Sequence, residues 1–211
     1  MNTDIIVQYF EEFLADRKSL ELVSYQLFEE PGTSKIEISV KDGDSISTVT
    51  GTGVGMIDAG FNSLVDHYSA EFASLDTVTL EDVYFQIDHK AQRDVSFKSQ
   101  MEIKLEFSNH CKDRTWFSGR TKSLGYTGVS VLVSAIEFYI NCELLFRRVK
   151  FLFDDAEKRK RPDVASKYKL SHKALETLSL ILWSLILTFA VFYLKDHIEQ
   201  KMRPIPHIRR Y

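Results

Sequence analysis

A strand–strand–strand–helix order that occurs twice between residues 20 and 153 constrains the fold of this chain more than any other feature. Apolar residues alternate with polar ones along the strand segments and recur at helical spacing in the segment after each third strand. In the first half we expect strands at 20–27, 36–40 and 46–50 and a helix at 56–72. In the second half we expect strands at 83–87, 101–107 and 115–119, a loop at 122–127 and a helix at 128–153.

The two halves also share local sequence. Residues 20–23 (LELV) resemble residues 80–83 (LEDV), and residues 35–38 (KIEI) resemble residues 100–103 (QMEI). Two sheets, each with one apolar face and a helix to cover it, can share one core. We therefore predict an α/β (α+β) domain over 19–153, built from two strand–strand–strand–helix repeats packed as a pseudo-twofold unit. A helix with one apolar stripe is expected before it, in residues 1–18.

Composition sets the broad class of the protein. Of the 211 residues, 44% are hydrophobic and 27% are charged, which is close to the average for globular domains and argues against wholesale disorder. The formal net charge of −3 gives no chain-wide basic field, so we expect no nucleic-acid partner. The two cysteines, Cys111 and Cys142, form no Cys-x-x-Cys motif and fit a reducing compartment.

The most apolar stretch of the sequence lies near the C-terminal end. Thr177 to Leu194 are eighteen residues without a charge. As a helix they would span roughly 27 Å, nearly the hydrocarbon thickness of a bilayer. We predict one transmembrane helix at 174–195, between a basic juxtamembrane linker at 154–173 and a short tail at 196–211. The alternative is a buried core helix of a soluble protein.

Basic residues predict how this helix is oriented. Seven Lys or Arg residues lie in the twenty positions before Thr177, and five follow Leu194. The excess favours the N-terminal side as the cytosolic side. The first residues do not resemble a signal peptide, because Asp4 comes early and the apolar run after it is short. We expect a single-pass membrane protein whose large N-terminal domain lies in the cytosol.

The basic run Lys158-Arg159-Lys160-Arg161 has two interpretations. It could be a nuclear signal or a nucleic-acid patch. Its position before the apolar segment favours a juxtamembrane role, where each basic residue near anionic lipid contributes roughly 1 kcal/mol.

The most specific local motif is Gly53-Val54-Gly55-Met56-Ile57-Asp58-Ala59. It resembles the G-x-G-P-V-D-A motif in the C-terminal regulatory domain of 2-isopropylmalate synthase and of the homocitrate and citramalate synthases. Asp94, Ser99 and residues 101–103 resemble the second-repeat strand of that domain. Residues 135–141 (AIEFYIN) resemble its closing helix, so the resemblance covers roughly residues 20–150 in order.

This resemblance implies a domain that binds an end-product amino acid such as leucine at a dimer interface near two motif loops. The positions that would carry the ligand are Gly53, Gly55, Asp58, Ala59 and Thr127. This sequence departs from the family in two ways. Met56 replaces the family's proline, and the second loop (119–127) lacks the family's aspartate, with Thr127 near that position. A retained fold is thus better supported than a retained amino-acid site.

The glycine loop 51–55 has a structural and a functional interpretation. It could be a turn that needs the conformational freedom of glycine, or it could bind a carboxylate with the N–H groups of a helix start. It matches neither the dinucleotide-binding fingerprint nor the phosphate-binding P-loop. Asp58 could contact a ligand ammonium group, or it could be a favourable charge at the helix N-terminus.

Catalytic and metal-binding patterns are not apparent in the sequence. The six histidines show no metal-ligand spacing with each other, with cysteine or with carboxylate pairs, and no nucleophile–base arrangement stands out. The catalytic activity of the resembled synthases belongs to a separate metal-dependent barrel of at least roughly 200 residues, for which this chain has no room. We expect no catalytic residues, no metal and no cofactor.

Three functions remain open at this stage. The first is a membrane-anchored accessory or scaffolding protein that pairs with itself or with a partner subunit. The second is an amino-acid sensor that keeps the pocket of the resembled family. The third, which the sequence favours least, is an enzyme of unknown type.

Overall fold

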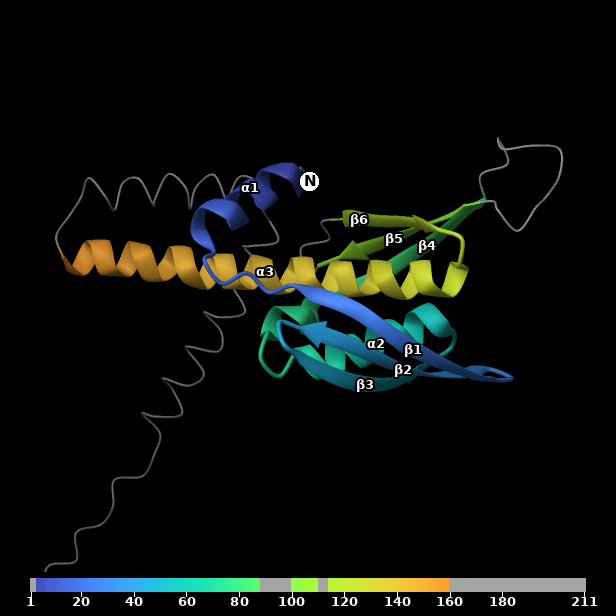
Figure 1. The fold of residues 1–211 in the computed structure, drawn as a ribbon. Coiled ribbons are helices and arrows are strands. Elements are labelled where there is room, and N and C mark those ends of the chain that lie inside the picture. Colours follow the sequence, from blue (N-terminus) through green and yellow to red (C-terminus); the bar gives the residue numbers. More distant parts are fainter. Residues whose placement is uncertain (1–2, 88–99, 110–113, 160–211) are drawn as a thin grey trace, which may run out of the picture.

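The computed structural model describes residues 3–87, 100–109 and 114–159. It has an α+β arrangement of two three-stranded antiparallel sheets, each followed by a helix, with one further helix at the N-terminal end. In Figure 1 the last helix runs between the two sheets. The predicted transmembrane helix at 174–195 and the tail at 196–211 lie outside the described residues, as do most of the predicted linker, Asp94 and Ser99.

The first half of the chain forms a helix, a sheet and a covering helix. These elements are α1 (Thr3–Phe13), β1 (Leu20–Glu30), β2 (Thr33–Asp42), β3 (Ser45–Gly53) and α2 (Met56–Tyr68). Two hairpin turns join the strands, and each has a glycine in the left-handed region: Gly32 has φ of 84° and Gly43 has φ of 60°. Both turns fall at residue pairs that favour tight turns, Pro31-Gly32 and Asp42-Gly43.

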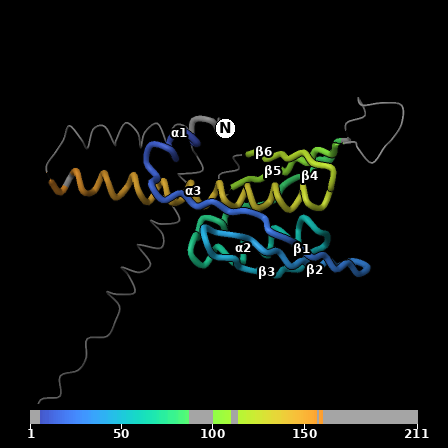
Figure 2. Tube along the Cα trace, in the orientation of Figure 1, coloured from blue at the N-terminus to red at the C-terminus, as the bar shows by residue number. Residues whose placement is uncertain are grey.

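The second half repeats the order after a short connector. Its elements are the 3₁₀ helix η1 (Ala73–Thr77), β4 (Thr79–Ile87), β5 (Met101–Ser108), β6 (Arg114–Thr121) and α3 (Leu124–Lys158). The tube in Figure 2 shows α1 lying beside the middle of α3. Phe10 and Phe138 make an edge-on ring contact between these two helices, with centroids 5.8 Å apart.

Two local predictions were wrong. The expected loop at 122–127 ends at Ser123, because α3 already begins at Leu124 and runs on to Lys158. Ser123 starts the helix: its hydroxyl oxygen accepts a hydrogen bond from the Tyr126 N–H at 3.3 Å, and its carbonyl accepts one from the Thr127 N–H at 2.9 Å. The expected bend at 51–55 is also shorter, because β3 continues through Gly53.

The two sheets carry the same irregularity. In the first sheet the pairing of β1 with β2 shifts between Leu22 and Ser24, and in the second the pairing of β4 with β5 shifts between Leu80 and Asp82. Each shift is a β-bulge that places one extra residue on the first strand of its sheet. Leu22 therefore corresponds to Leu80. The local sequence likeness had matched Leu20 with Leu80, which is two residues away. Because the side-chain period of a strand is two, that difference leaves the predicted faces unchanged.

The core lies between the inner faces of the two sheets. Ile36, Ile38 and Val40 of β2 are fully buried, and Ile103, Leu105 and Phe107 of β5 are fully buried at the corresponding positions. Helix α2 packs on β2 and β3, whereas α3 packs on β5 and β6 of the second sheet and on β1 of the first. Each predicted apolar face therefore contributes to one continuous core.

Corresponding glycines lie where the two covering helices meet. A Cβ atom at Gly60 of α2 would lie 2.9 Å from Leu132 Cδ1 of α3, and one at Gly128 of α3 would lie 2.6 Å from Ile57 Cδ1 of α2. The absence of a side chain at Gly60 and Gly128 lets α2 and α3 approach closely.

Helix α3 is the one helix in the described ranges whose length and composition would allow it to cross a membrane. The most apolar 18-residue window within Leu124–Ala156 has a mean hydropathy of 1.6, and 78% of that window is buried inside the protein. A core helix packed between two sheets has this degree of burial. Helix α3 is thus a mostly buried helix of the domain, and it is distinct from the segment 177–194.

Candidate functional site

The motif loop begins where β3 passes directly over the start of α2. A Cβ atom at Gly53 would lie 2.5 Å from the Ala59 backbone nitrogen and would also collide with the Asp58 carboxylate. A Cβ atom at Gly51 would lie 2.6 Å from the Ala59 carbonyl oxygen. Both positions therefore need glycine because the strand and the helix backbone are in close contact.

Asp58 is bonded to its own loop. Its Oδ2 accepts a hydrogen bond from the Val54 N–H at 2.9 Å, so the carboxylate closes the turn from β3 into α2. This position in the first turn of α2 also favours a negative charge. The structure therefore places Asp58 as a loop-closing residue, with Val54 beside it 82% exposed.

Gly55 and Ala59 differ sharply in their surroundings. Ala59 is fully buried against β3, where it belongs to the core. Gly55 precedes the first residue of α2 with φ of −153°, and a Cβ atom there would meet no described atom within 4 Å. Neither backbone conformation nor space therefore requires glycine at position 55.

Thr127 lies in the first turn of α3 and is buried. Its hydroxyl donates to the Ser123 carbonyl at 2.6 Å and lies 2.5 Å from the Thr121 hydroxyl oxygen. A Cβ atom at Gly119 of β6 would lie 3.2 Å from the Thr127 methyl group, as one at Gly51 would meet Ala59 in the first half. Thr127 is therefore the counterpart of Ala59, and Tyr126 is the counterpart of Asp58.

The two motif loops meet at Met56. A Cβ atom at Gly125 would lie 3.5 Å from Met56 Sδ, and one at Gly128 would lie 3.2 Å from Met56 Cε. The starts of α2 and α3 are thus neighbours, and Met56 lies between them. Tyr25 of β1 also approaches, because its hydroxyl would contact a Cβ atom at Gly125. Four of the five predicted ligand positions, Gly53, Gly55, Asp58 and Ala59, lie in the turn from β3 into α2, with Ala59 buried. The buried Thr127 side chain instead faces Gly119 of β6 and the Ser123 carbonyl.

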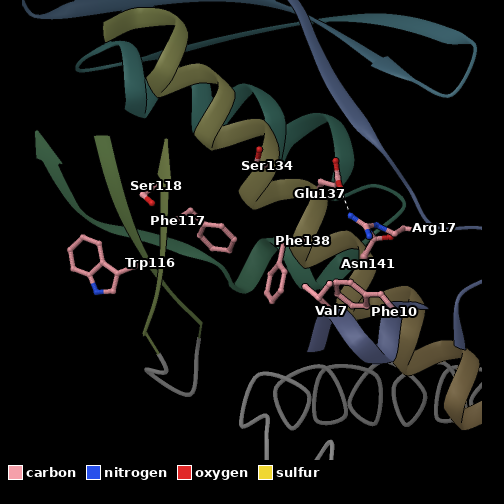
Figure 3. A pocket seen from close by; sticks show the side chains of 10 residues that line it. All are labelled: Val7, Phe10, Arg17, Trp116, Phe117, Ser118, Ser134, Glu137, Phe138 and Asn141. Carbon is pink, nitrogen blue, oxygen red and sulfur yellow. Dashed lines mark hydrogen bonds and ion pairs between the residues drawn. The ribbon is translucent and has the colours of Figure 1, made fainter. Parts of the chain in front are cut away.

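A second candidate site, which sequence reasoning missed, is a cavity of about 310 Å³ between α1, β6 and α3. We call it the α1–β6 groove. Its apolar lining comes from all three elements, and Figure 3 shows these side chains around one opening: Val7, Phe10, Trp116, Phe117 and Phe138.

Polar residues of α3 line the same groove and hold the chain between α1 and β1. Asn141 accepts a hydrogen bond from the Lys18 N–H at 3.0 Å and donates one to the Lys18 carbonyl at 2.9 Å. Glu137 accepts one from the Leu20 N–H at 2.8 Å and pairs with the Arg17 guanidinium at 3.3 Å. The signal that could have revealed them is a pair of polar residues four apart in the most apolar part of the helix.

Glu143 is a third polar residue of α3, and it is fully buried. Its carboxylate accepts a hydrogen bond from the Ser74 N–H of η1 at 3.0 Å and pairs with Arg147. Arg147 in turn donates to the Glu71 carbonyl at 2.8 Å. These contacts attach the connector between the two halves to α3.

Burial shifts the acid–base behaviour of two neighbouring side chains of α3. Desolvation raises the pKa of the Cys142 thiol and of the Tyr139 hydroxyl above their ordinary values. Elsewhere, the hydrogen bond to Asp42 raises the pKa of the Lys18 ammonium. A thiol with a raised pKa stays protonated and is a poor nucleophile at neutral pH.

In the described ranges, no three His, Cys, Asp or Glu side chains lie together in a way that could hold a metal ion. His89, His110 and Cys111 lie outside those ranges.

Comparison with known proteins adds no family. No protein-family model matches the chain, and no curated protein sequence matches it.

Proposed function

We propose that this protein is a membrane-anchored, non-catalytic binding or scaffolding protein, an accessory or assembly subunit of a membrane complex. The domain associates with a second copy or with a partner subunit, and the segment 174–195 holds it at the membrane. The observation that carries the proposal is that the buried polar side chains, and those of the motif, form hydrogen bonds within the domain. Asp58, Thr127, Asn141 and Glu143 each bond to backbone groups of the domain itself, which is the pattern of a structural scaffold.

The sequence of the anchor supports the membrane part of the proposal. Thr177 to Leu194 contain no charge, and the basic residues before them suit a cytosolic membrane surface. The apolar surface of α3 is mostly buried inside the domain. The segment 177–194 is a second stretch whose length and composition suit a transmembrane helix.

The anchor is tested by alkaline extraction of membranes from cells that express the full chain. The wild-type chain should stay in the membrane pellet. Replacing Leu185 and Phe189 with arginine should release it, because two charges near the middle of a span cost about 5–7 kcal/mol on the insertion scale. Leu185→Ile is the matched control and should stay in the pellet. A wild-type chain that leaves the membrane under these conditions would contradict the anchor.

Association is the second part of the proposal. We relate the two repeats by a pseudo-twofold axis, as the matched bulges and the glycine pair Gly60 and Gly128 suggest. This is also the organisation that the resemblance to synthase regulatory domains implies, and in that family the domain mediates dimerisation. Light scattering of the full chain in a mild detergent should give a mass above that of one chain. A single chain per micelle at all concentrations would argue against self-association and leave a different subunit as partner.

The second candidate function is an amino-acid (leucine-like) sensor. The observation that favours it is the pair of adjacent helix starts at Met56 and Leu124, with open space beside the Gly55 Cα and no side-chain cap there among the described residues. Backbone N–H groups at such ends can bind a carboxylate. Thermal unfolding of the full chain with leucine and related amino acids tests this, with Gly55→Val as the variant that blocks the loop. Unchanged melting temperatures across the set would remove the sensor.

A further inference from the structure

The α1–β6 groove exposes apolar surface that the domain itself leaves open. Val7 of α1 is 37% exposed and Trp116 of β6 is 48% exposed, while Phe10 and Phe138 form a buried floor below them. Figure 3 shows Trp116 on one side of the opening and Val7 on the other. A groove with an aromatic floor and an open apolar rim is suited to side chains of an apolar helix.

We propose that, when no membrane is available, the apolar segment Thr177–Leu194 docks in the α1–β6 groove of the same chain. The inference rests on the proposed anchor and adds the place where the anchor lies before it enters a bilayer. Removing large apolar side chains from water is favourable. A few side chains of the segment in the groove therefore offset much of the cost of keeping it in water.

The chain can reach the groove. The groove contacts α3 near Asn141, and α3 continues for about 26 Å from there to Lys158 at the rise of a helix. The eighteen residues 159–176 can span up to about 60 Å when extended. The tether thus allows the segment to return along α3, and it raises its effective concentration at the groove to about the millimolar range.

Charge complementarity favours this occupant. Helix α1 exposes Glu11 and Glu12, which follow the groove-lining Phe10 in sequence, and Asp16 just after the helix is also exposed. The linker that would cross this acidic surface is strongly basic, with Arg159, Lys160, Arg161, Lys167, Lys169 and Lys173. Opposite charges at a partly exposed surface contribute modestly and lose strength as salt rises.

The polar groups of the groove argue against a small polar ligand. Both ends of the Asn141 amide are bonded to the Lys18 backbone, and Glu137 is bonded to the Leu20 N–H and to Arg17. A polar ligand that bound Glu137 or Asn141 would have to displace these bonds, and the remaining polar lining is Arg17, Ser118 and Ser134. Apolar side chains of a docked helix need no polar partner, so they fit the groove as it stands.

The two tryptophans of the chain provide the test, because Trp116 lines the groove and Trp183 lies in the segment. In the full chain with Trp183→Phe, acrylamide quenching reports access to the groove. Without vesicles, adding Val7→Lys should make Trp116 several-fold more quenchable, because a charge on the rim expels the segment. Ile46→Lys is the matched control, since Ile46 is an exposed apolar residue on the other sheet, and it should leave quenching unchanged.

Equal quenching of Trp116 in the parent and in the Val7→Lys variant would overturn the docking. Protection of Trp116 that grows with protein concentration would overturn it too, because the occupant would then come from another molecule. Far-UV circular dichroism must show that both variants keep the helices, and Val7→Ala offers a milder change if the lysine variant unfolds.

Vesicles separate this inference from the proposed anchor. Phosphatidylcholine with brominated acyl chains should quench Trp183 in the Trp116→Phe chain and expose Trp116 in the Trp183→Phe chain. If Trp116 is protected in water but bromine does not reach Trp183, docking stands and the anchor is wrong. If bromine quenches Trp183 but Val7→Lys changes nothing in water, the anchor stands and docking is wrong.

Discussion

At the scale of single residues, the glycines of the motif have different reasons to be there. Gly53 is required by packing, because a Cβ atom would lie 2.5 Å from the Ala59 nitrogen, which belongs to the rigid backbone of α2. Gly55 has an extended backbone and open space around its Cα. A sequence motif alone cannot separate these cases, since both positions read as glycine.

The first prediction follows from that contrast. Gly53→Ala should lower the free energy of unfolding by about 1–3 kcal/mol, because the new methyl group forces β3 away from α2. Gly55→Ser should raise it by about a few tenths of a kcal/mol, because serine at this position can cap α2. Urea unfolding followed by circular dichroism measures both. Equal effects of the two changes would show that the close approach at Gly53 does not exist.

A second residue-scale prediction concerns pH. Burial raises the pKa of the Cys142 thiol above its ordinary 9.0, so the folded chain keeps this proton after the unfolded chain has lost it. The resulting stabilisation is complete below pH 9 and is lost as pH rises above it, by about 1.4 kcal/mol per pH unit for one proton. The pKa values of Tyr68 and Tyr139 are also raised, so titration of these two hydroxyls lowers the free energy of unfolding further as pH rises above 10.

The check is urea unfolding between pH 8 and 10 under reducing conditions. The free energy of unfolding of the Cys142→Ala variant should fall less steeply with pH than that of the wild type. The difference in slope should correspond to one titrating proton. Parallel curves for the two proteins would show that the Cys142 thiol titrates alike in the folded and unfolded chains.

At the scale of elements, α3 holds the rest of the domain in place through polar groups within an apolar helix. Asn141 and Glu137 bind the segment that leads from α1 into β1, and Glu143 binds η1. The third prediction is that Glu143→Ala lowers the free energy of unfolding by about 1–3 kcal/mol, because the buried Ser74 N–H loses its acceptor. Hydrogen exchange should become faster in Ala73–Thr77.

Glu143→Gln is the matched control, because its amide oxygen can still accept from Ser74. It should keep most of the protection of η1. If alanine and glutamine at this position accelerate exchange equally, the charge pair with Arg147 rather than the bond to Ser74 holds the connector.

Much of the element order could be predicted from the sequence, for physical reasons that differ along the chain. Period-two alternation and the Asp42-Gly43 turn fixed β2 and β3, because one face of the sheet is dry and the hairpin needs a left-handed glycine. The start of α3 was misplaced because Gly125, inside the expected loop 122–127, is a poor helix former. Gly125 instead lies in the helix and makes room for Tyr25, which comes from a distant part of the chain.

The candidate site was less predictable than the fold. The motif located the first loop, but which of its residues face the core depends on how β3 crosses α2. The α1–β6 groove joins residues more than a hundred positions apart, such as Val7 and Trp116, and no local pattern reports such a pairing. Its one sequence signal was the pair Glu137 and Asn141 in α3.

At the scale of the whole molecule, the two halves share one core. Leu132 of α3 reaches Gly60 of α2, Ile57 of α2 reaches Gly128 of α3, and α3 also packs on β1 of the first sheet. Neither half can bury its apolar faces alone, because the covering helices lie between both sheets. The fourth prediction is therefore that the domain unfolds in one cooperative transition, as small domains with a single core do.

Two tryptophan probes measure this prediction, one in each half. The first is Trp116 in the Trp183→Phe chain, which reports the second sheet. The second is Ile46→Trp in a chain with Trp116→Phe and Trp183→Phe, which reports the first sheet at an exposed position that tolerates a large side chain. The two urea midpoints should coincide. Gly60→Leu should shift both midpoints together to lower urea, since overpacking at the helix crossing strains both halves. A shift of one midpoint alone would mean that the two repeats fold as separate units and that the contact between α2 and α3 does not join them.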